Sequence, residues 1–301
     1  MPFQTEYQKY LDPQVVSRLS RLDLIARLVV EGFISGLHRS PYHGFSVEFS
    51  EHRPYIPGDP LRNIDWKVLG RTDRFYVKQF EEETNLKAYL LLDASNSMRY
   101  ASRAITKSRY ASCLSAALSY LMLMQRDAVG LAVFDNALRS YIPPRSAYTA
   151  LNAILKQLDA SECRNDTDLA SVLHVMAERI QRRGLVVLLS DLLDDPQNVL
   201  NALKHFRHKK HEVIVFHILD PAEIAMGFDR ETVFVDMETQ EEIQTQPRHL
   251  RSGYDAAVSS WMERFKLECR EHRIDYIPMD TSASFADALF RYLIVRKRLG
   301  G

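Results

Sequence analysis

Three oxygen-bearing side chains stand at alternate positions in the segment Asp93-Ala-Ser95-Asn-Ser97. A carboxylate and two hydroxyls with this spacing, on a loop that leaves an apolar run, can converge on one point. Two later segments carry similar groups, Asp166-Thr167-Asp168 before a predicted helix and Ser190-Asp191 after a second apolar run. Their oxygens are hard ligands, which suit Mg²⁺, Mn²⁺ or Ca²⁺ better than zinc or copper. The pattern therefore predicts a divalent-cation site.

The segments that must position these groups begin at residue 86, where short apolar runs alternate with longer amphipathic ones. The runs predict strands at 86–92, 128–134, 185–189, 212–218 and 275–277, with helices near 105–125, 147–158, 168–182, 197–208, 249–272 and 285–297. Such a pattern is typical of an α/β fold with a mostly parallel sheet covered by helices on both faces. Ligands bind at the carboxyl ends of strands in these sheets, which is where Asp93 and Asp191 are expected.

The residues before this alternation predict a separate, smaller unit. Helical spacing of apolar residues predicts one helix over 13–37, and alternation over 74–82 predicts a strand for which a sheet edge is one available position. We expect residues 1–84 to form this N-terminal helix and β segment, and residues 85–301 to form the α/β domain. A short hairpin is predicted over 232–243.

The cation pattern resembles the metal-ion-dependent adhesion site of von Willebrand factor A-type (vWA) domains. The matching residues are Asp93, Ser95, Ser97, Thr167 and Asp191. The resemblance implies that the hydroxyls contact the ion directly or through water, and that the aspartates act largely through water. It also implies that a carboxylate of a partner protein completes the shell, and that the fold is vWA-like.

A second pattern lies upstream, in residues 53–71. The residues that carry it are Arg53, Tyr55, Gly58, Asp59, Arg62, Ile64, Asp65, Trp66 and Arg71. They resemble the signature of the bacterial family called domain of unknown function fifty-eight, whose later hairpin is similar to residues 235–239. The resemblance implies a partnership with a MoxR-type AAA+ ATPase in the assembly or maturation of other proteins. Many relatives carry N-terminal membrane helices, which this sequence does not show.

From the residues alone, we interpret this upstream segment, residues 53–71, as a structural corner in which the chain turns and packs on the sheet. The turn Pro57-Gly58-Asp59-Pro60 has restricted geometry, and Asp59 could cap the helix that Pro60 begins. Arg62 and Asp65 are close enough to pair, and Trp66 would anchor the corner on the sheet. The alternative is a partner-facing or anion-binding patch formed by the arginines Arg53, Arg62 and Arg71.

Composition excludes several classes of function. Lys plus Arg and Asp plus Glu number 39 each, which argues against a nucleic-acid binder. Three scattered cysteines without a CxxC motif favour a reducing, cytoplasmic location. No apolar run approaches the roughly 20 residues of a membrane span, and no signal peptide is evident. Motifs of nucleotide-binding loops, zincins and serine hydrolases are absent. The basic stretch with His205, His208 and His211 is interpreted as a solvated helix end, with metal binding as the minority view.

We expect a metal-dependent protein-binding adaptor that is not an enzyme. The alternative is a metal-dependent hydrolase in which Asp168 or Asp194 acts as the base, although the sequence places no His or Lys near these loops. A third interpretation is a purely structural interaction domain whose ion site is empty and whose partner binding is unchanged by EDTA. In the structural reading of the motif itself, Asp93 and Asp166 cap helices and the serines satisfy the loop backbone.

Overall fold

The computed structural model describes residues 8–37, 53–54, 70, 75–77, 86–228, 230–237 and 241–299. Its central element is a six-stranded sheet with the order β10-β7-β6-β3-β4-β5. The strands are β3 (Lys87–Asp93), β4 (Ala128–Phe134), β5 (Leu138–Arg145), β6 (Leu185–Ser190), β7 (Glu212–Leu219) and β10 (Asp275–Asp280). All neighbours pair in parallel except β4 and β5. The predicted mostly parallel α/β sheet is thus confirmed.

Strand β5 was not expected from the sequence. Its residues are only half-buried, and it contains Pro143 and Pro144, which cannot donate hydrogen bonds to a ladder. Among the described residues the strand pairs with β4 alone, at the edge of the sheet, so its outer side needs no donors. Close packing there also requires Gly130, because a Cβ at that position would lie 2.5 Å from the carbonyl oxygen of Ile142.

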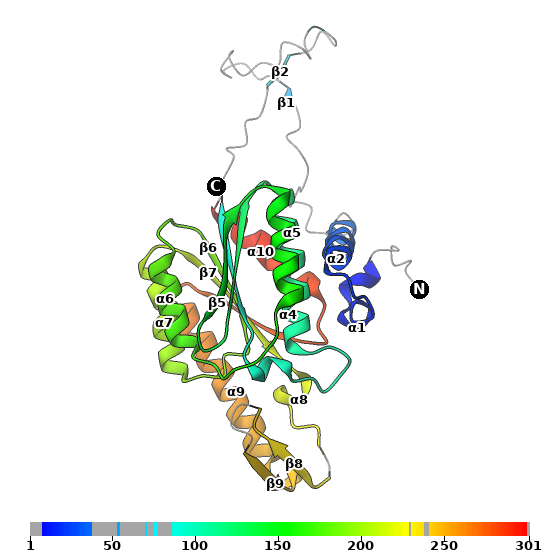
Figure 1. Cartoon of the computed structure of the whole chain (residues 1–301), viewed down its shortest axis with the longest axis vertical. Helices are drawn as coiled ribbons and strands as arrows, with labels where there is room; N and C mark the ends of the chain where they lie inside the picture. The colour runs from blue at the N-terminus through cyan, green and yellow to red at the C-terminus, as the bar shows by residue number, and fades with distance from the viewer. Residues whose placement is uncertain are drawn as a thin grey trace.

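Helices cover both faces of the sheet (Figure 1). One layer contains α2 (Leu22–Leu37), α4 (Lys107–Met124), α5 (Tyr148–Ala160) and α10 (Phe285–Leu299), and the other contains α6 (Leu169–Arg179), α7 (Pro196–His208) and α9 (Pro247–Glu271). Alternate residues of β3 divide between the two cores: Leu90 belongs to the first and Leu91 to the second. This is the period of two that a strand covered on both faces requires.

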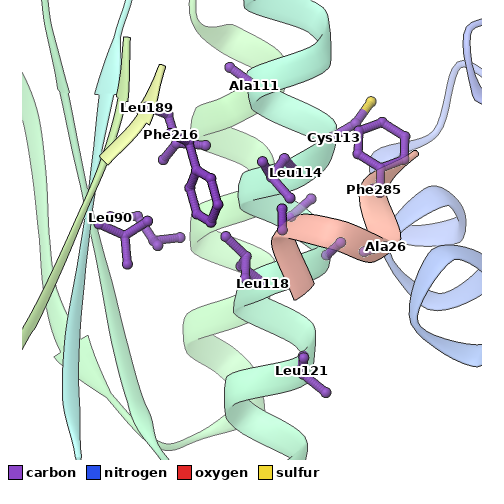
Figure 2. Packing of buried hydrophobic residues seen from close by; sticks show 14 of the residues in the cluster. Ala26, Leu90, Ala111, Cys113, Leu114, Leu118, Leu121, Leu189, Phe216 and Phe285 are labelled. Carbon is purple, nitrogen blue, oxygen red and sulfur yellow. The ribbon is translucent and has the colours of Figure 1, made fainter. Parts of the chain in front are cut away.

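Helix α4 is the buried centre of the first layer. Thr106 caps it by accepting a hydrogen bond from the backbone N–H of Arg109 at 3.1 Å. Leu114 and Leu118 pack toward Phe216 of the sheet, while Phe285 of α10 lies near the opposite side of the helix (Figure 2). This packing fixes the start of α4 beside the carboxyl ends of the strands.

The N-terminal residues join this same core. The single helix predicted over 13–37 is instead two helices, α1 (Pro13–Val16) and α2, after the 3-10 turn η1 (Gln8–Leu11). Ser17 donates its hydroxyl to the carbonyl of Gln14, a local bond that competes with helix continuation. Helix α2 packs against α4, so the described N-terminal helices share the hydrophobic core of the sheet. The boundary near residue 84 stays a prediction.

The remaining elements are short. The predicted hairpin is confirmed as β8 (Thr232–Val235) and β9 (Glu242–Thr245), which pair antiparallel. With α8 (Pro221–Ile224), it extends from the end of the sheet near the start of α9 (Figure 1). Within the predicted strand 74–82, Tyr76–Val77 form β2 and pair with β1 (Arg53–Pro54). Among the described residues, no helix combines the length and apolar character needed to cross a membrane.

Candidate functional site

An aspartate stands at the carboxyl end of every parallel strand. These residues are Asp93, Asp135, Asp191, Asp220 and Asp280, and each accepts a hydrogen bond from the backbone N–H two residues later. Such local turns let the chain leave a buried strand without orphaned N–H groups. The array therefore has a structural purpose, and a ligand site must be argued from contacts beyond these turns.

Asp93, Ser95 and Ser97 lie close together in one turn after β3. The Asp93 carboxylate accepts hydrogen bonds from the Ser95 N–H at 2.9 Å and from the Ser190 hydroxyl at 2.5 Å. The Ser95 and Ser97 Oγ atoms lie 3.0 Å apart, at the start of the turn η3 (Asn96–Arg99). All three side chains are buried. Two loops, after β3 and β6, are thus joined through Ser190 and Asp93.

The loop that carries Thr167 lies against the first loop. The Asn96 N–H donates to the carbonyl of Asn165 at 2.9 Å, and the Asn96 side-chain amide donates to the carbonyl of Arg164 at 3.0 Å. The Thr167 Oγ1 atom is buried, and it has no hydrogen-bond partner among the described residues. Asp168, not Asp166, caps the following helix, because it accepts from the Ser171 N–H.

Lys107 is a member of the site that sequence reasoning missed. The sequence placed no His or Lys near these loops, and that inference was wrong. The side chain of Lys107 is 0% exposed, and its Nζ donates to Asp191 at 2.7 Å and to Glu223 at 2.6 Å. A signal did exist, since Lys107 begins helix α4, where the dipole disfavours a cation. A lysine there requires acidic partners, but the sequence does not say which.

His217 is the second missed residue, and it comes from β7. Its Nε2 lies 2.9 Å from the carbonyl oxygen of Asp191, so Nε2 carries the proton and donates it. Its Nδ1, 2.6 Å from the Tyr276 hydroxyl, then accepts. Burial lowers the pKa of His217 to about 4, which keeps the ring neutral. The histidine therefore fixes the backbone of Asp191 and has no nitrogen free to act as a base.

Burial and neighbouring charges shift the pKa values of three groups in the site. Burial, together with the nearby Asp191 carboxylate, raises the pKa of Asp93 to about 7. Burial also raises the pKa of Glu223, although Lys107 opposes the shift. For Lys107 burial acts to lower the pKa, but Asp191 and Glu223 outweigh it, and the pKa lies above its ordinary value. A cation bound near Asp93 would reduce the repulsion between the Asp93 and Asp191 carboxylates.

Two hollows adjoin the Asp93 loop. A cavity of about 130 Å³ lies behind it, lined in part by Asp93, Ser112 and Cys163. A more open groove of about 470 Å³ runs past Ala94, and Arg139 and Arg164 contribute to its lining. Both arginines have ion-pair partners, Asp135 and Glu162, while their own side chains are 47% and 70% exposed. The groove therefore lies beside the Asp93 loop and has charged side chains in its lining.

Of the predicted corner residues, Arg53 is among those that the structure describes. Arg53 begins β1 and pairs in register with Val77. The other corner residues, Tyr55, Asp59, Arg62, Asp65, Trp66 and Arg71, lie outside the described residues. The choice between a structural corner and an arginine patch therefore stays a prediction.

Comparison with known proteins gives a family and no activity. Residues 51–264 match the family described as "Protein of unknown function DUF58". Uncharacterized proteins of Mycobacterium bovis and Mycobacterium tuberculosis are 28% identical over 232 residues, which cover 76% of this chain and 72% of each relative.

Similar solved structures are also known. BatB from Bacteroides thetaiotaomicron has a TM-score of 0.46 at 15% identity, over 71% of this chain and 98% of that one. An aerotolerance-related membrane protein from Bacteroides fragilis has a TM-score of 0.48 at 19% identity, over 70% and 99%. With scores below 0.5, these likenesses carry no inference about function.

Proposed function

Since the chain belongs to the DUF58 family of proteins of unknown function, we propose a function from its own residues: it is a protein-binding adaptor that uses a divalent cation, Mg²⁺ by preference over Mn²⁺ or Ca²⁺, to hold a partner's carboxylate. The ion would be held by Asp93, Ser95, Ser97, Thr167 and Asp191 in a vWA-like site. The observation that carries the proposal is the buried, unpartnered Thr167 hydroxyl. Turns and helix caps account for the aspartates, but they leave this hydroxyl without a purpose.

The serine pair supports the choice of ion. Mg²⁺ binds oxygens at about 2.0–2.1 Å in an octahedron, so that adjacent ligands lie about 2.8–3.0 Å apart. The Ser95 and Ser97 hydroxyl oxygens have this separation. A hydrogen bond between hydroxyls is commonly shorter, at about 2.7–2.8 Å. The pair is therefore spaced for a shared hard cation at least as well as for a mutual hydrogen bond.

Lys107 explains why the ion would seek an external ligand. One oxygen of Asp191 is taken by the Lys107 ammonium, and Asp93 already accepts two hydrogen bonds. Few negative charges would remain to neutralise a bound divalent ion. A bound divalent ion would attract a carboxylate, and an Asp or Glu of a partner protein is suited to complete its shell.

The identity of the partner rests on the family resemblance. A MoxR-type AAA+ ATPase is the expected partner, acting with this chain in protein assembly or maturation, and a cytoplasmic location belongs to the same proposal. The groove lined by Arg139 and Arg164 offers exposed cationic side chains beside Ala94.

The hydrolase alternative loses support from the positions of its proposed bases. Asp168 accepts the Ser171 N–H as a helix cap. Asp194 accepts the N–H groups of Ala170 and Asp195. A carboxylate that stabilises helix termini in this way is poorly placed to take a proton from a reacting water. We therefore favour binding over catalysis.

The test combines ion binding with partner capture. The tagged full-length chain is used to capture proteins from its native cytosol, in Mg²⁺ or in EDTA, as wild type and as Ser95→Ala/Ser97→Ala. The matched control is Ser259→Ala/Ser260→Ala, which changes two adjacent exposed serines of α9. Circular dichroism checks that each variant is folded. Calorimetry with Mg²⁺ is run on the same proteins, with and without the captured partner.

We expect a partner, with an AAA+ ATPase foremost, that is retained only in Mg²⁺ and only by wild type and the control. A partner that binds equally in EDTA and to the Ser95/Ser97 variant would make the site structural and overturn the proposal. Unfolding of that variant would count against it too, because the serines would then serve the fold. Metal-dependent turnover of a phosphoester or peptide, lost in Asp93→Ala, would instead establish the hydrolase.

A further inference from the structure

Two histidines meet on the outer side of the second helical layer, away from the serine site. His174 belongs to α6 and His205 to α7, two helices that pack side by side (Figure 1). Their Nδ1 atoms lie 3.1 Å apart. The sequence singled out His205 with His208 and His211 as a basic cluster, but it did not reveal His174 as a neighbour. The pairing exists only because α6 and α7 are adjacent.

We propose that His174 and His205 form a second metal site, which takes a borderline transition-metal ion such as Zn²⁺, Ni²⁺ or Cu²⁺. Two imidazole nitrogens bound to one ion at about 2.0–2.1 Å lie about 2.9–3.4 Å apart, from a right angle to the tetrahedral angle. The observed separation of 3.1 Å falls inside this range. Imidazole ligands suit these ions, whereas the all-oxygen serine site does not. The two sites should therefore select different metals.

Glu178 determines which ring nitrogen of His205 carries the proton. One oxygen of its carboxylate lies 2.9 Å from the His205 Nε2 atom, which consequently carries the proton. The Nδ1 atom of His205 then accepts a hydrogen bond from the His174 Nδ1 atom, and an ion would take the place of that proton while His174 keeps its proton on Nε2. A carboxylate that holds the outer N–H of a metal-binding histidine is a common supporting contact. Lys209 holds the other oxygen of Glu178 at 2.6 Å and so keeps the carboxylate in place.

The surrounding charge does not oppose a cation at this position. Three basic residues near His205, on α7 or just after it, have acidic partners. The pairs are Lys204 with Glu268 at 3.0 Å, Arg207 with Glu212 at 2.7 Å, and Lys209 with Glu178. A divalent ion would thus approach paired charges rather than a field of bare ammonium groups.

The other histidines of the cluster are not suited to this site. His211 is buried, and its two ring nitrogens contact the Ile180 carbonyl and the Gly184 N–H. His208 is exposed and serves as a matched control on the same helix. His174 is also exposed, so water can complete the coordination shell. A bound ion would join α6 to α7 and stabilise that layer.

A different group on α9 could compete for the ion. Glu268, Glu271 and His272 offer ligand atoms within 4.8 Å of one another. Glu268 is also paired with the Lys204 ammonium. The experiment must therefore separate the two positions, and His272→Ala does so.

The test is calorimetry with Zn²⁺ on the untagged full-length chain after treatment with EDTA. We expect one ion per chain, and a loss of affinity of about tenfold or more in His174→Ala and in His205→Ala, because each removes a ligand. Glu178→Gln should weaken binding about tenfold through the supporting contact. His208→Ala, His272→Ala and Ser95→Ala/Ser97→Ala should bind as wild type does. With Cu²⁺, electron paramagnetic resonance should show two coupled nitrogens in wild type and one in each histidine variant.

Several results would overturn the inference. Unchanged affinity in both His174→Ala and His205→Ala would show that zinc binds elsewhere. Loss of binding in His272→Ala would place the ion on α9, and loss in the Ser95/Ser97 variant would place it at the serine site. Circular dichroism before and after EDTA confirms that the variants are folded. None of these outcomes depends on the adaptor function, because Mg²⁺ binding and partner capture are measured separately.

Discussion

The buried ion cluster around Lys107 gives the sharpest test of the structural argument. Lys107→Met keeps an unbranched side chain of similar length and removes only the charge. In the folded chain the ammonium joins Asp191, which is 1% exposed, to Glu223, which is 23% exposed. The substitution would leave both carboxylates without their cation. It therefore measures how far the fold depends on one long-range charge contact.

The expected magnitude follows from the cost of an uncompensated buried charge. Removing one partner of a buried ion pair typically lowers the free energy of unfolding by about 3–5 kcal/mol. The pKa of Glu223 is already raised by burial, so this group can escape part of the cost by taking a proton. The loss should thus be largest above the folded pKa of Glu223 and should shrink as the pH falls through it. Glu223→Gln in the Lys107→Met background should recover part of the loss.

Urea unfolding followed by circular dichroism measures this loss, in EDTA and at two pH values of about 8 and about 5. The midpoint reports the stability as long as the slope is unchanged. The matched control is Lys156→Met, an exposed lysine of α5, which should change stability by no more than about 0.5 kcal/mol. A loss below about 1 kcal/mol in Lys107→Met at an unchanged slope would refute the reasoning, because the two carboxylates would then not need the ammonium.

Two further predictions concern the candidate ligands. Because the folded pKa of Asp93, about 7, lies above its ordinary value of 3.8, the metal-free fold binds this proton more tightly than the unfolded chain does, and stability should rise as the pH falls from about 8 toward 5. Asp93→Asn should be more stable than wild type at about pH 8 in EDTA, and a difference between the two that does not vary with pH would contradict this. Thr167→Val removes a buried hydroxyl that lacks a partner, so it should stabilise the metal-free chain by up to about 1 kcal/mol. The same change should weaken Mg²⁺ binding in calorimetry, and destabilisation in EDTA would show that the hydroxyl is bonded in the fold.

The strands of the sheet could be predicted because their signals are local. A continuous apolar run such as residues 88–92 is typical of a central strand in a sheet that is covered on both faces. The edge strand β5 lacks such a run, and its two prolines argue against a strand unless the neighbour on one side is known to be missing. The break between α1 and α2 was missed because the apolar residues keep a helical period through it. The hydrogen bond from the Ser17 hydroxyl to the Gln14 carbonyl, where the helix is interrupted, does not change that period.

The candidate site likewise combines contacts that are local in the sequence with contacts between distant residues. Asp93, Ser95 and Ser97 belong to one turn, and their convergence follows from spacing along the chain. The contacts of Lys107 with Asp191 and Glu223 join residues 84 and 116 positions apart. No spacing rule reaches across such separations. The missed His217 likewise depends on β7 lying next to β6.

By itself, the sequence determined which chemical groups stand at the ends of the strands, since the alternation of apolar runs and polar loops is a property of neighbouring residues. Tertiary structure alone decided how the charges of those groups are compensated, because the order β10-β7-β6-β3-β4-β5 brings distant loops to one edge. There, burial removes water, and each carboxylate must find a hydroxyl, an N–H or an ammonium in place of it. The same dependence on adjacency applies to His174 and His205, whose helices are neighbours only in the folded chain.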